Sequence, residues 1–573
     1  MPSEVSPFRQ RAARLLSALG EENSLETVRA AQLELSRMRD AFRRKKHVFD
    51  AATLAMLKDL AARAKKRSEA GLGEARQLAL KTLQETFGYE SFRPGQEDLI
   101  ASVLAGRDTI GIMPTGAGKS LTYQIPARIL GGTSLVVSPL IALMKDQVDA
   151  VSEVGIRATY LNSTLSSEER SARLAALKRG EYELLYAAPE GLEGSVGSIL
   201  GGLDLRFIAI DEAHCISQWG HDFRPAYRKL FGLKQRFHVP ILALTATATA
   251  EVTADIQKQL SMHDPCLLRG SFYRSNLRLS AYKKGESLGM TTQNAILRLT
   301  QSRPGQSGII YCLSRKKTEE LASFLRSHGV SARAYHAGLS TEQRSEIQDA
   351  FRDDRIDVIT ATIAFGMGID KPNVRYVIHA DMPRSIEGYY QEIGRGGRDG
   401  LESECVLFYS WSEVRAYDRF AAESGDELLA DRIRSQAREM FEMAEATECR
   451  HATLVGYFGE TIGPCGGSCE RCSGSDILLS AQGRRTVQRV RPNAAPRESE
   501  IDGELFEALR ACRRALAEER DVPAYVVFSD ASLLEMAALR PTTLGELSRI
   551  PGVGPTKLAR YGEAFLKVLR ASG

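Results

Sequence analysis

Short apolar runs that alternate with helical stretches restrict the fold of this chain more than any other feature. One set lies at 109–113, 134–137, 184–187, 207–210 and 241–244, and a second at 308–311, 358–360, 376–379 and 406–408. Runs of three to five residues that are apolar on both faces are typical of parallel strands covered by helices. The sequence therefore predicts an α/β protein with two tandem parallel-sheet domains.

Chain length and local composition indicate further segments around these sheets. A chain of 573 residues is too long to fold around one hydrophobic core, so several domains are expected. The first segment is rich in Ala, Leu and Arg and shows no strand-like alternation, so it is expected to be helical. The expected divisions are a helical N-terminal extension (1–80), two sheet domains (81–272 and 273–412), a helical cysteine-bearing module (413–476), a basic linker (477–500) and a small all-α domain (501–573).

Charge and hydropathy narrow the class of protein. The formal net charge is only +4, so total charge does not by itself indicate a polyanionic partner. No apolar run approaches the roughly 20 residues that a membrane helix needs. The first residues lack the charged and then apolar build of a secretory signal. We therefore expect a cytoplasmic protein with no membrane partner, whose cysteines stay reduced.

A glycine-rich segment after the first apolar run predicts a phosphate-binding loop. Glycines let successive backbone N–H groups point at phosphates, and the following helix adds positive potential. In this pattern the lysine contacts the β- and γ-phosphates and the serine binds Mg²⁺. The segment departs from the usual pattern because Met113 stands where the first glycine is expected. The candidate nucleotide-binding residues are Thr115, Gly116, Ala117, Gly118, Lys119 and Ser120.

Two adjacent carboxylates follow the apolar run 207–210. Asp211 is placed to hold Mg²⁺ together with Ser120, and Glu212 to polarise a water molecule. Such a pair after a strand is often only surface charge, but the upstream phosphate loop favours the functional interpretation. Phosphoryl transfer also needs a cation near the γ-phosphate, and Arg395 and Arg398 of the second domain are the candidates. An arginine supplied by a separate domain would couple hydrolysis to domain closure.

Four of the nine cysteines lie close together in the sequence, as Cys449, Cys465, Cys469 and Cys472. Four thiolates at such spacing suit tetrahedral Zn²⁺ in a closed structural site. Two alternatives remain open here: reduced thiols without metal, and His451 as a substitute ligand.

Beyond single motifs, the order of the motifs resembles that of RecQ-family DNA helicases in superfamily 2. The resemblance covers residues from about 80 to 475 and the C-terminal segment. The motifs that carry it are Phe92-Arg-Pro-Gly-Gln96, the phosphate loop, Val137-Ser-Pro-Leu-Ile-Ala-Leu-Met-Lys-Asp-Gln147, the stretch from Asp211 to Pro225, Leu244-Thr-Ala-Thr247, Tyr335-His-Ala-Gly338, Ile363-Ala-Phe-Gly-Met-Gly-Ile-Asp370 and the Arg395/Arg398 segment.

The resemblance implies two RecA-like domains that bind ATP and Mg²⁺, translocate on single-stranded DNA and unwind duplex or forked DNA in the 3′→5′ direction during repair and recombination. It implies that Tyr89, Arg93 and Gln96 contact adenine and that Arg398 acts as the arginine finger, assisted by Arg395. It also implies an aromatic loop that senses single-stranded DNA, in which rings stack on bases and arginine holds phosphate. That loop comprises Gln218, Trp219, His221, Phe223 and Arg224. For Trp219, a core-packing role is the competing interpretation.

The C-terminal domain resembles the HRDC domain that RecQ helicases share with RNase D. Its Ile550-Pro-Gly-Val-Gly554 turn is similar to helix–hairpin–helix turns, whose N–H groups bind DNA phosphates. Lys557 is then a candidate DNA contact. A purely structural turn between two helices is the competing interpretation.

A winged-helix domain, which RecQ enzymes commonly place before HRDC, is not expected here because too few residues separate the two modules. Three functions therefore stay open: a helicase, a DNA-dependent ATPase that remodels or anneals strands with weak unwinding, and a non-catalytic DNA-binding scaffold. Single-stranded and forked DNA are the expected partners, together with single-strand-binding protein and other repair factors. A bacterial protein of this kind would be nucleoid-associated.

Overall fold

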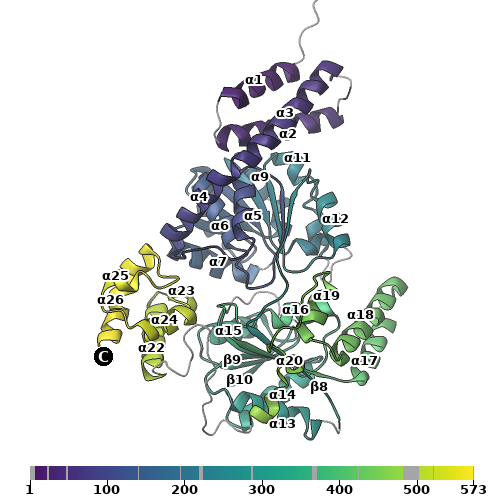
Figure 1. The fold of residues 1–573 in the computed structure, drawn as a ribbon, viewed down its shortest axis with the longest axis vertical. Coiled ribbons are helices and arrows are strands. Elements are labelled where there is room, and N and C mark those ends of the chain that lie inside the picture. The colour runs from purple at the N-terminus through teal and green to yellow at the C-terminus, as the bar shows by residue number, and fades with distance from the viewer. Residues whose placement is uncertain are drawn as a thin grey trace, which may run out of the picture. The chain divides into compact units, whose positions relative to one another are not determined.

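The computed structural model describes residues 7–21, 25–44, 46, 49–139, 141–193, 195–217, 224–285, 288–363, 365, 371–423, 425–481, 503–520 and 522–571. They form two compact units that divide mainly between Gly270 and Ser271, and each unit contains one parallel sheet (Figure 1). The predicted α/β class with two tandem parallel sheets is confirmed.

The first sheet has seven parallel strands in the order β3-β4-β2-β5-β6-β1-β7. Because all strands are parallel, their carboxyl ends meet at one edge of the sheet, where ligands bind in folds of this kind. The strands are β1 (Thr109–Ile112), β2 (Thr133–Val137), β3 (Ala158–Leu161), β4 (Leu184–Ala187), β5 (Leu205–Ile210), β6 (Ile241–Thr245) and β7 (Cys266–Arg269).

Helices surround this sheet. One buried cluster joins three of them through Ala79, Ile100 and Ile125. The helices of the domain are α4 (Leu72–Thr82), α5 (Gln96–Leu104), α6 (Leu121–Leu130), α7 (Ile141–Glu153), α8 (Ser167–Lys178), α9 (Ser195–Leu200), α10 (Pro225–Arg228), α11 (Leu233–Phe237) and α12 (Ala250–Gln259).

Three N-terminal helices, α1 (Pro7–Glu21), α2 (Leu25–Arg44) and α3 (Ala51–Ala70), form a bundle with its own core. Apolar side chains at helical spacing, such as Val28, Leu35 and Leu60, fill that core. Asp50 caps α3 by accepting a hydrogen bond from the Thr53 backbone N–H at 2.7 Å.

A buried arginine of α2 joins this bundle to the first sheet domain. The Arg29 guanidinium donates to the carbonyl oxygens of Val103 and Leu104, each at 3.2 Å, and to that of Arg206 at 3.1 Å. Burial, followed by repulsion from Arg206, lowers the pKa of Arg29 to about 10, so the side chain stays charged at neutral pH. The three carbonyl oxygens therefore have a permanently charged donor.

Replacing Arg29 with methionine is expected to loosen the bundle. The apolar stem is kept, but three carbonyl oxygens lose a charged donor, which should cost on the order of 3 kcal/mol. Hydrogen exchange in α1–α3 should rise more than in α5. Arg37→Met, on the same helix but exposed, is the control, and equal exchange in the two variants would contradict this anchoring role.

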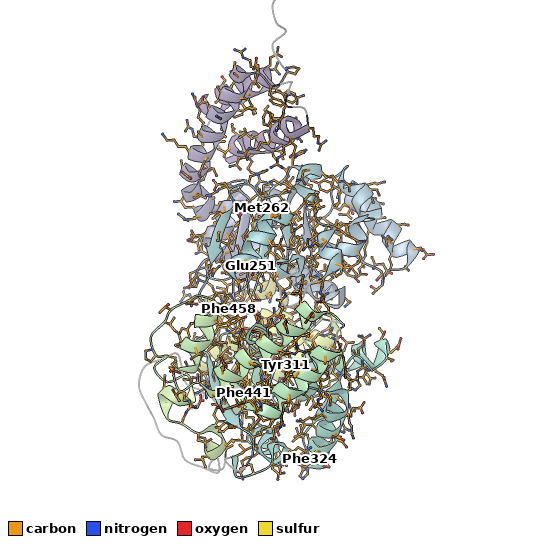
Figure 2. All side chains as sticks on the ribbon, turned by 90° about the vertical axis from the view of Figure 1, so that its right-hand side faces the viewer. Glu251, Met262, Tyr311, Phe324, Phe441 and Phe458 are labelled. Atoms are coloured by element: carbon orange, nitrogen blue, oxygen red, sulfur yellow. The ribbon has the colours of Figure 1, made fainter. Side chains whose placement is uncertain are left out.

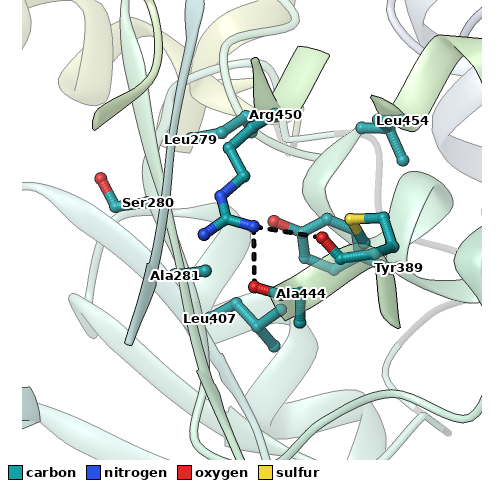
Figure 3. Close-up of a pocket in the computed structure, with 9 residues that line it drawn as sticks. Leu279, Ser280, Ala281, Tyr389, Leu407, Ala444, Arg450 and Leu454 are labelled. Atoms are coloured by element: carbon teal, nitrogen blue, oxygen red, sulfur yellow. Dashed lines mark hydrogen bonds between the residues drawn. The ribbon is translucent and has the colours of Figure 1, made fainter. Parts of the chain in front are cut away.

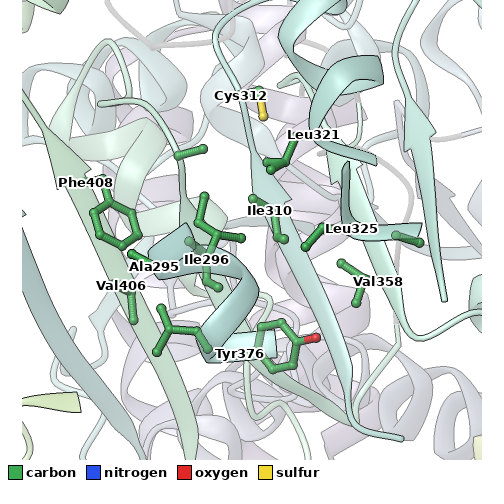
Figure 4. Packing of buried hydrophobic residues seen from close by; sticks show 14 of the residues in the cluster. Ala295, Ile296, Ile310, Cys312, Leu321, Leu325, Val358, Tyr376, Val406 and Phe408 are labelled. Atoms are coloured by element: carbon green, nitrogen blue, oxygen red, sulfur yellow. The ribbon is translucent and has the colours of Figure 1, made fainter. Parts of the chain in front are cut away.

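The second sheet has six parallel strands in the order β10-β11-β9-β12-β13-β8. Figure 4 shows part of its core, where Ile310, Val358 and Phe408 pack beneath α13 and α14. The elements are β8 (Leu277–Lys283), α13 (Thr292–Gln301), β9 (Ser307–Tyr311), α14 (Arg315–Ser327), β10 (Ala332–Tyr335), α15 (Thr341–Arg352), β11 (Val358–Ala361), β12 (Val374–His379), α16 (Ile386–Ile393) and β13 (Ser403–Tyr409).

Helices follow the second sheet in two groups. The first is α17 (Trp411–Ala422), α18 (Glu427–Glu445), α19 (Arg450–Tyr457), α20 (Glu470–Ser473) and α21 (Ile477–Ser480). Phe441 lies in α18 of this group, and Phe458 directly follows α19 (Figure 2). Phe441 packs edge-on against Trp411, and Phe458 stacks on Phe272, which precedes β8, with ring centroids 4.5 Å apart. The second group has its own apolar core and comprises α22 (Gly503–Glu519), α23 (Ala524–Val527), α24 (Asp530–Leu539), α25 (Leu544–Leu547) and α26 (Pro555–Ala571).

Candidate nucleotide site and zinc module

The phosphate-loop residues and the paired carboxylates follow strands of one sheet. The loop follows β1, and Asp211 and Glu212 follow β5, with β6 lying between these two strands. Both segments therefore emerge at the carboxyl edge of the sheet. Thr115, Gly116 and Ala117 form the turn, and Ser120 precedes the first residue of α6. The amino end of that helix adds positive potential where phosphate would bind.

A buried glutamine fixes the shape of the loop. Gln96 Nε2 donates to the Gly118 carbonyl at 2.9 Å, and Gln96 Oε1 accepts from the Arg93 backbone N–H at 2.8 Å. Gly118 has φ = +79°, and a Cβ at this position would overlap Gln96 Nε2. Lys119 Nζ lies 3.5 Å from the Met113 carbonyl. Two of the predicted contact groups, Gln96 and the loop, are thus connected directly.

Gly118→Ala is expected to weaken nucleotide binding by at least tenfold, because the methyl group must displace the Gln96 amide as well as strain the backbone by about 1 kcal/mol. Gly180→Ala is the matched control, since Gly180 has φ = +74° and open space around it. Titration with a fluorescent ATP analogue measures the effect. Equal nucleotide affinity in the two variants would show that the contact between Gln96 and Gly118 does not matter for nucleotide binding.

The second carboxylate lies beside a hydrogen-bonded series that reaches the next strand. Glu212 has a left-handed backbone (φ = +48°), and its Oε2 lies 3.3 Å from His214 Nδ1. His214 Nδ1 also lies 2.9 Å from Thr245 Oγ1, which in turn donates to the Thr247 carbonyl at 2.9 Å. Because the Thr245 hydroxyl donates its only hydrogen to the Thr247 carbonyl, it accepts the hydrogen that His214 carries on Nδ1. His214 therefore lies against Glu212 without donating to it, and the Glu212 carboxylate is a neighbour of the Leu244–Thr247 motif.

Asp211 and the adenine candidates are also placed by the fold. The Tyr227 hydroxyl donates to the Asp211 carbonyl at 2.9 Å, and the Glu212 N–H donates to Asp211 Oδ1 at 3.0 Å. Tyr89 is 41% exposed, so its ring is accessible for stacking.

Most of the predicted DNA-sensing loop, namely Gln218, Trp219, His221 and Phe223, lies outside the described residues. Arg224 is described: its N–H donates to the Cys215 carbonyl at 2.9 Å, and its Nη1 lies 3.5 Å from the Pro139 carbonyl. Arg224 therefore connects the carboxylate segment with the Ser-Pro segment after β2.

The two candidate arginines differ in accessibility within the second domain. Arg395 is buried next to Tyr311, whose pKa is raised to about 12 by burial, and Arg398 is only partly buried. Arg274 holds their segment by donating to the carbonyl oxygens of Gly394, Gly396 and Gly397 at 2.7–2.9 Å. Sequence motifs did not indicate Arg274, because its role depends on carbonyl oxygens about 120 residues away.

The four predicted cysteines lie together in the structure. Their Sγ atoms all lie within 4.8 Å of one another, with 3.5 Å between Cys465 and Cys469 and 4.0 Å between Cys469 and Cys449. Tetrahedral Zn²⁺ with Zn–S bonds of about 2.3 Å requires sulfur–sulfur distances of about 3.8 Å. The cluster, completed by Cys472, therefore fits a structural zinc ion.

His451 lies outside this cluster. Its Nε2 acts as a hydrogen-bond donor to two carbonyl oxygens, that of Leu277 at 3.0 Å and that of Ser468 at 3.3 Å. The geometry favours Cys472 over His451 as the fourth ligand. The Leu279 N–H donates to the Ser468 carbonyl at 2.9 Å, so the cysteine segment is attached to the edge strand β8.

A buried arginine beside the first cysteine holds the helices of the module together. Arg450 Nη1 donates to the carbonyl oxygens of Met443 and Ala444 at 3.1 and 2.7 Å (Figure 3), and its Nε donates to Glu470 Oε1 at 2.7 Å. These contacts connect α18, α19 and α20 into one body.

Lys557, the predicted DNA contact of the C-terminal domain, takes part in packing. Its ammonium donates to the Val526 carbonyl at 2.6 Å and lies over the Phe528 ring. This contact supports the structural interpretation of the turn, and a DNA role for Lys557 stays a prediction.

Comparison with known proteins agrees with this architecture. The chain matches the family models for the DEAD/DEAH box helicase over residues 93–256, the helicase conserved C-terminal domain over 291–400, the RecQ zinc-binding domain over 412–473 and the HRDC domain over 502–569.

Two relatives show the family, and a third is similar over a smaller part of its own length. The ATP-dependent DNA helicase RecQ of Pasteurella multocida is 38% identical over 599 residues, covering 86% of this chain and 94% of the relative. The Bacillus subtilis protein of the same name is 37% identical, covering 86% and 98%. The RecQ-like DNA helicase blm-1 of Caenorhabditis elegans is 43% identical, covering 66% of this chain and 39% of the relative. The chain therefore belongs to the RecQ family of ATP-dependent DNA helicases.

Proposed function

We propose that this protein hydrolyses ATP to translocate 3′→5′ on single-stranded DNA and so unwinds duplex or forked DNA in repair and recombination. The observation that carries the proposal is that Asp211 and Glu212 follow β5 at the same sheet edge as the phosphate loop, which follows β1. Family membership adds the substrate class, and the 3′→5′ polarity rests on the resemblance alone.

In this mechanism each residue has one task. Lys119 neutralises the β- and γ-phosphates, and Glu212 polarises the attacking water. Ser120 and Asp211 are the proposed ligands of Mg²⁺, which would neutralise phosphate charge when bound. Arg398, the more accessible of the two arginines, is the proposed finger from the second domain, with Arg395 assisting.

Nucleotide and DNA recognition complete the proposal. Tyr89 stacks on adenine, while Arg93 and Gln96 hold its edge. Gln218, Trp219, His221, Phe223 and Arg224 sense single-stranded DNA, and Lys557 contributes a phosphate contact. Single-strand-binding protein and other repair factors are the proposed partners. In a bacterium the protein would act in the cytoplasm, at the nucleoid. None of the described helices is long and apolar enough to cross a membrane.

A strand-remodelling ATPase with weak unwinding is the second candidate. The alignment with the Pasteurella protein spans 599 positions although this chain has 573 residues, so the relative carries segments that this chain lacks. Between α21, which ends at Ser480, and α22, which begins at Gly503, the sequence is too short for a winged-helix domain. Another structural element would then have to separate the two DNA strands.

Hydrolysis and polarity test these candidates. We expect single-stranded DNA to stimulate ATP hydrolysis, and duplexes with a 3′ single-stranded tail to be opened in preference to those with a 5′ tail. The absence of ATP hydrolysis in the presence of single-stranded DNA would favour the third candidate, a non-catalytic scaffold. Preference for the 5′ tail would overturn the polarity.

A further inference from the structure

The N-terminal bundle and the first sheet domain enclose a cavity of about 300 Å³. Its walls come from α2, α3, the segment that enters β1, α11 and the segment that enters β7. This volume is at the lower end of the range for small-ligand sites. None of the matched family models includes α1–α3.

This cavity is separate from the candidate nucleotide site. Asp108 directly precedes β1 and His263 lies shortly before β7, so the cavity is at the edge where these strands begin. The phosphate loop follows β1 at the opposite edge. A ligand in the cavity would therefore be distinct from ATP.

The cavity wall carries excess positive charge. Four cationic side chains line it, against two carboxylates. Lys234 pairs with Asp108 at 2.6 Å, and Lys65 pairs with Asp264 at 2.7 Å. The remaining two cations are Arg39 and Arg107.

These two guanidinium groups are not matched by carboxylates. Within the described part of the chain, neither Arg39 nor Arg107 makes an ion pair, although both act electrostatically on Asp264. A planar guanidinium suits an oxyanion with two acceptor atoms, such as phosphate. Arg39 comes from α2 and Arg107 from the segment that enters β1, and both line this cavity.

The positive charge around the cavity also affects His263, which is one of the residues that line it. Its Nε2 accepts a hydrogen bond from Arg43 Nη2 at 3.1 Å, so the ring is neutral in this arrangement. Burial, followed by the charges of Arg43 and Arg39, lowers its pKa, while Asp108 opposes the shift. Lys234 adds to the lowering. A bound anion would offset the positive charge of these side chains and so raise the pKa of His263.

We propose that this cavity is a phosphate-binding site, in which Arg39 and Arg107 hold one phosphate group of a small ligand or of a DNA strand. Lys65 and Lys234 also line the cavity, each paired with a carboxylate. The site uses no residue of the proposed ATP or DNA machinery.

The test uses the full-length protein with inorganic phosphate and pyrophosphate as probes. Isothermal titration should show binding to the wild type, reduced by about tenfold or more in the Arg39→Gln/Arg107→Gln variant, because two charge-assisted contacts are lost. The Lys58→Gln/Lys66→Gln variant removes the same charge from exposed positions of α3 and should bind like the wild type. Equal binding in the two double variants, or no binding to the wild type, would overturn the proposal.

The pKa of His263 gives a readout that does not depend on activity. Nuclear magnetic resonance titration, with His263→Gln to assign the signal, should show that phosphate raises this pKa in the wild type. In the Arg39→Gln/Arg107→Gln variant the pKa should be higher without phosphate and insensitive to it. A pKa unchanged by phosphate in the wild type would contradict the site.

Affinity for single-stranded DNA distinguishes the two sources of phosphate. If the DNA backbone occupies the cavity, the arginine variant should bind DNA more weakly, and its salt slope should fall by roughly 0.7 for each lost contact. If a small ligand occupies it, DNA affinity should match that of the lysine control while phosphate binding is lost. Either result supports the site, provided that unfolding temperature and DNA-free ATP hydrolysis match the wild type.

Discussion

Replacing Lys119 with alanine is expected to lower the turnover number of ATP hydrolysis by about 10²–10³-fold or more, as loss of a charge-stabilising group in a phosphoryl-transfer site does. Affinity for single-stranded DNA should stay within a few-fold of the wild type, because DNA contacts are assigned to other segments. Among the described residues the Lys119 ammonium makes one long hydrogen bond, to the Met113 carbonyl at 3.5 Å, so its removal is expected to cost little stability. DNA-stimulated phosphate release and fluorescence anisotropy measure the two quantities.

Lys178→Ala, at an exposed position near the end of α8, is the control for charge removal. It should leave both quantities unchanged. Loss of both hydrolysis and DNA binding in Lys119→Ala, with a lowered unfolding temperature, would instead indicate a structural role for Lys119.

Loss of the zinc site is expected to have the second large effect. Cys469→Ser should remove about one zinc ion per chain and destabilise α18–α21. The apparent binding energy of structural zinc, about 10–16 kcal/mol, is comparable with the whole stability of a domain. Cys469 is 2% exposed and lies beside β8, so its loss also disturbs that edge of the sheet. Elemental analysis and thermal unfolding measure the result.

Cys512→Ser, in the C-terminal domain and outside the cluster, should keep the metal. Full zinc content in Cys469→Ser would contradict the four-cysteine site. Zinc retained in Cys472→Ser but lost in His451→Ala would identify His451 as the fourth ligand after all.

The interior of both sheets could be predicted from sequence, and their edges could not. The nine predicted strands are the inner strands, where both faces are buried and the apolar run is continuous. The four edge strands, β3, β7, β8 and β10, were not predicted. Each has at least one partly exposed position, and β7 alternates between exposed and half-buried residues. Such mixed patterns do not stand out from loops.

Candidate site residues were predictable where the chemistry is local. The phosphate loop, the paired carboxylates and the cysteine cluster each lie in a short segment of the chain. The contacts that support them are not local: Gln96 reaches Gly118 across 22 residues, and His214 reaches Thr245 across 31. Such pairs follow from strand order, which single motifs do not contain. The basic cavity was not predictable for the same reason, since five separate elements form it.

Strand displacement on a forked duplex tests the central claim most directly. The substrate carries a 3′ single-stranded tail and a fluorophore–quencher pair at the fork, and an excess of unlabelled strand prevents reannealing. The account predicts displacement with ATP that is absent with a non-hydrolysable analogue and absent in Lys119→Ala. Rapid DNA-stimulated ATP hydrolysis with no displaced strand would contradict it and would favour the strand-remodelling ATPase.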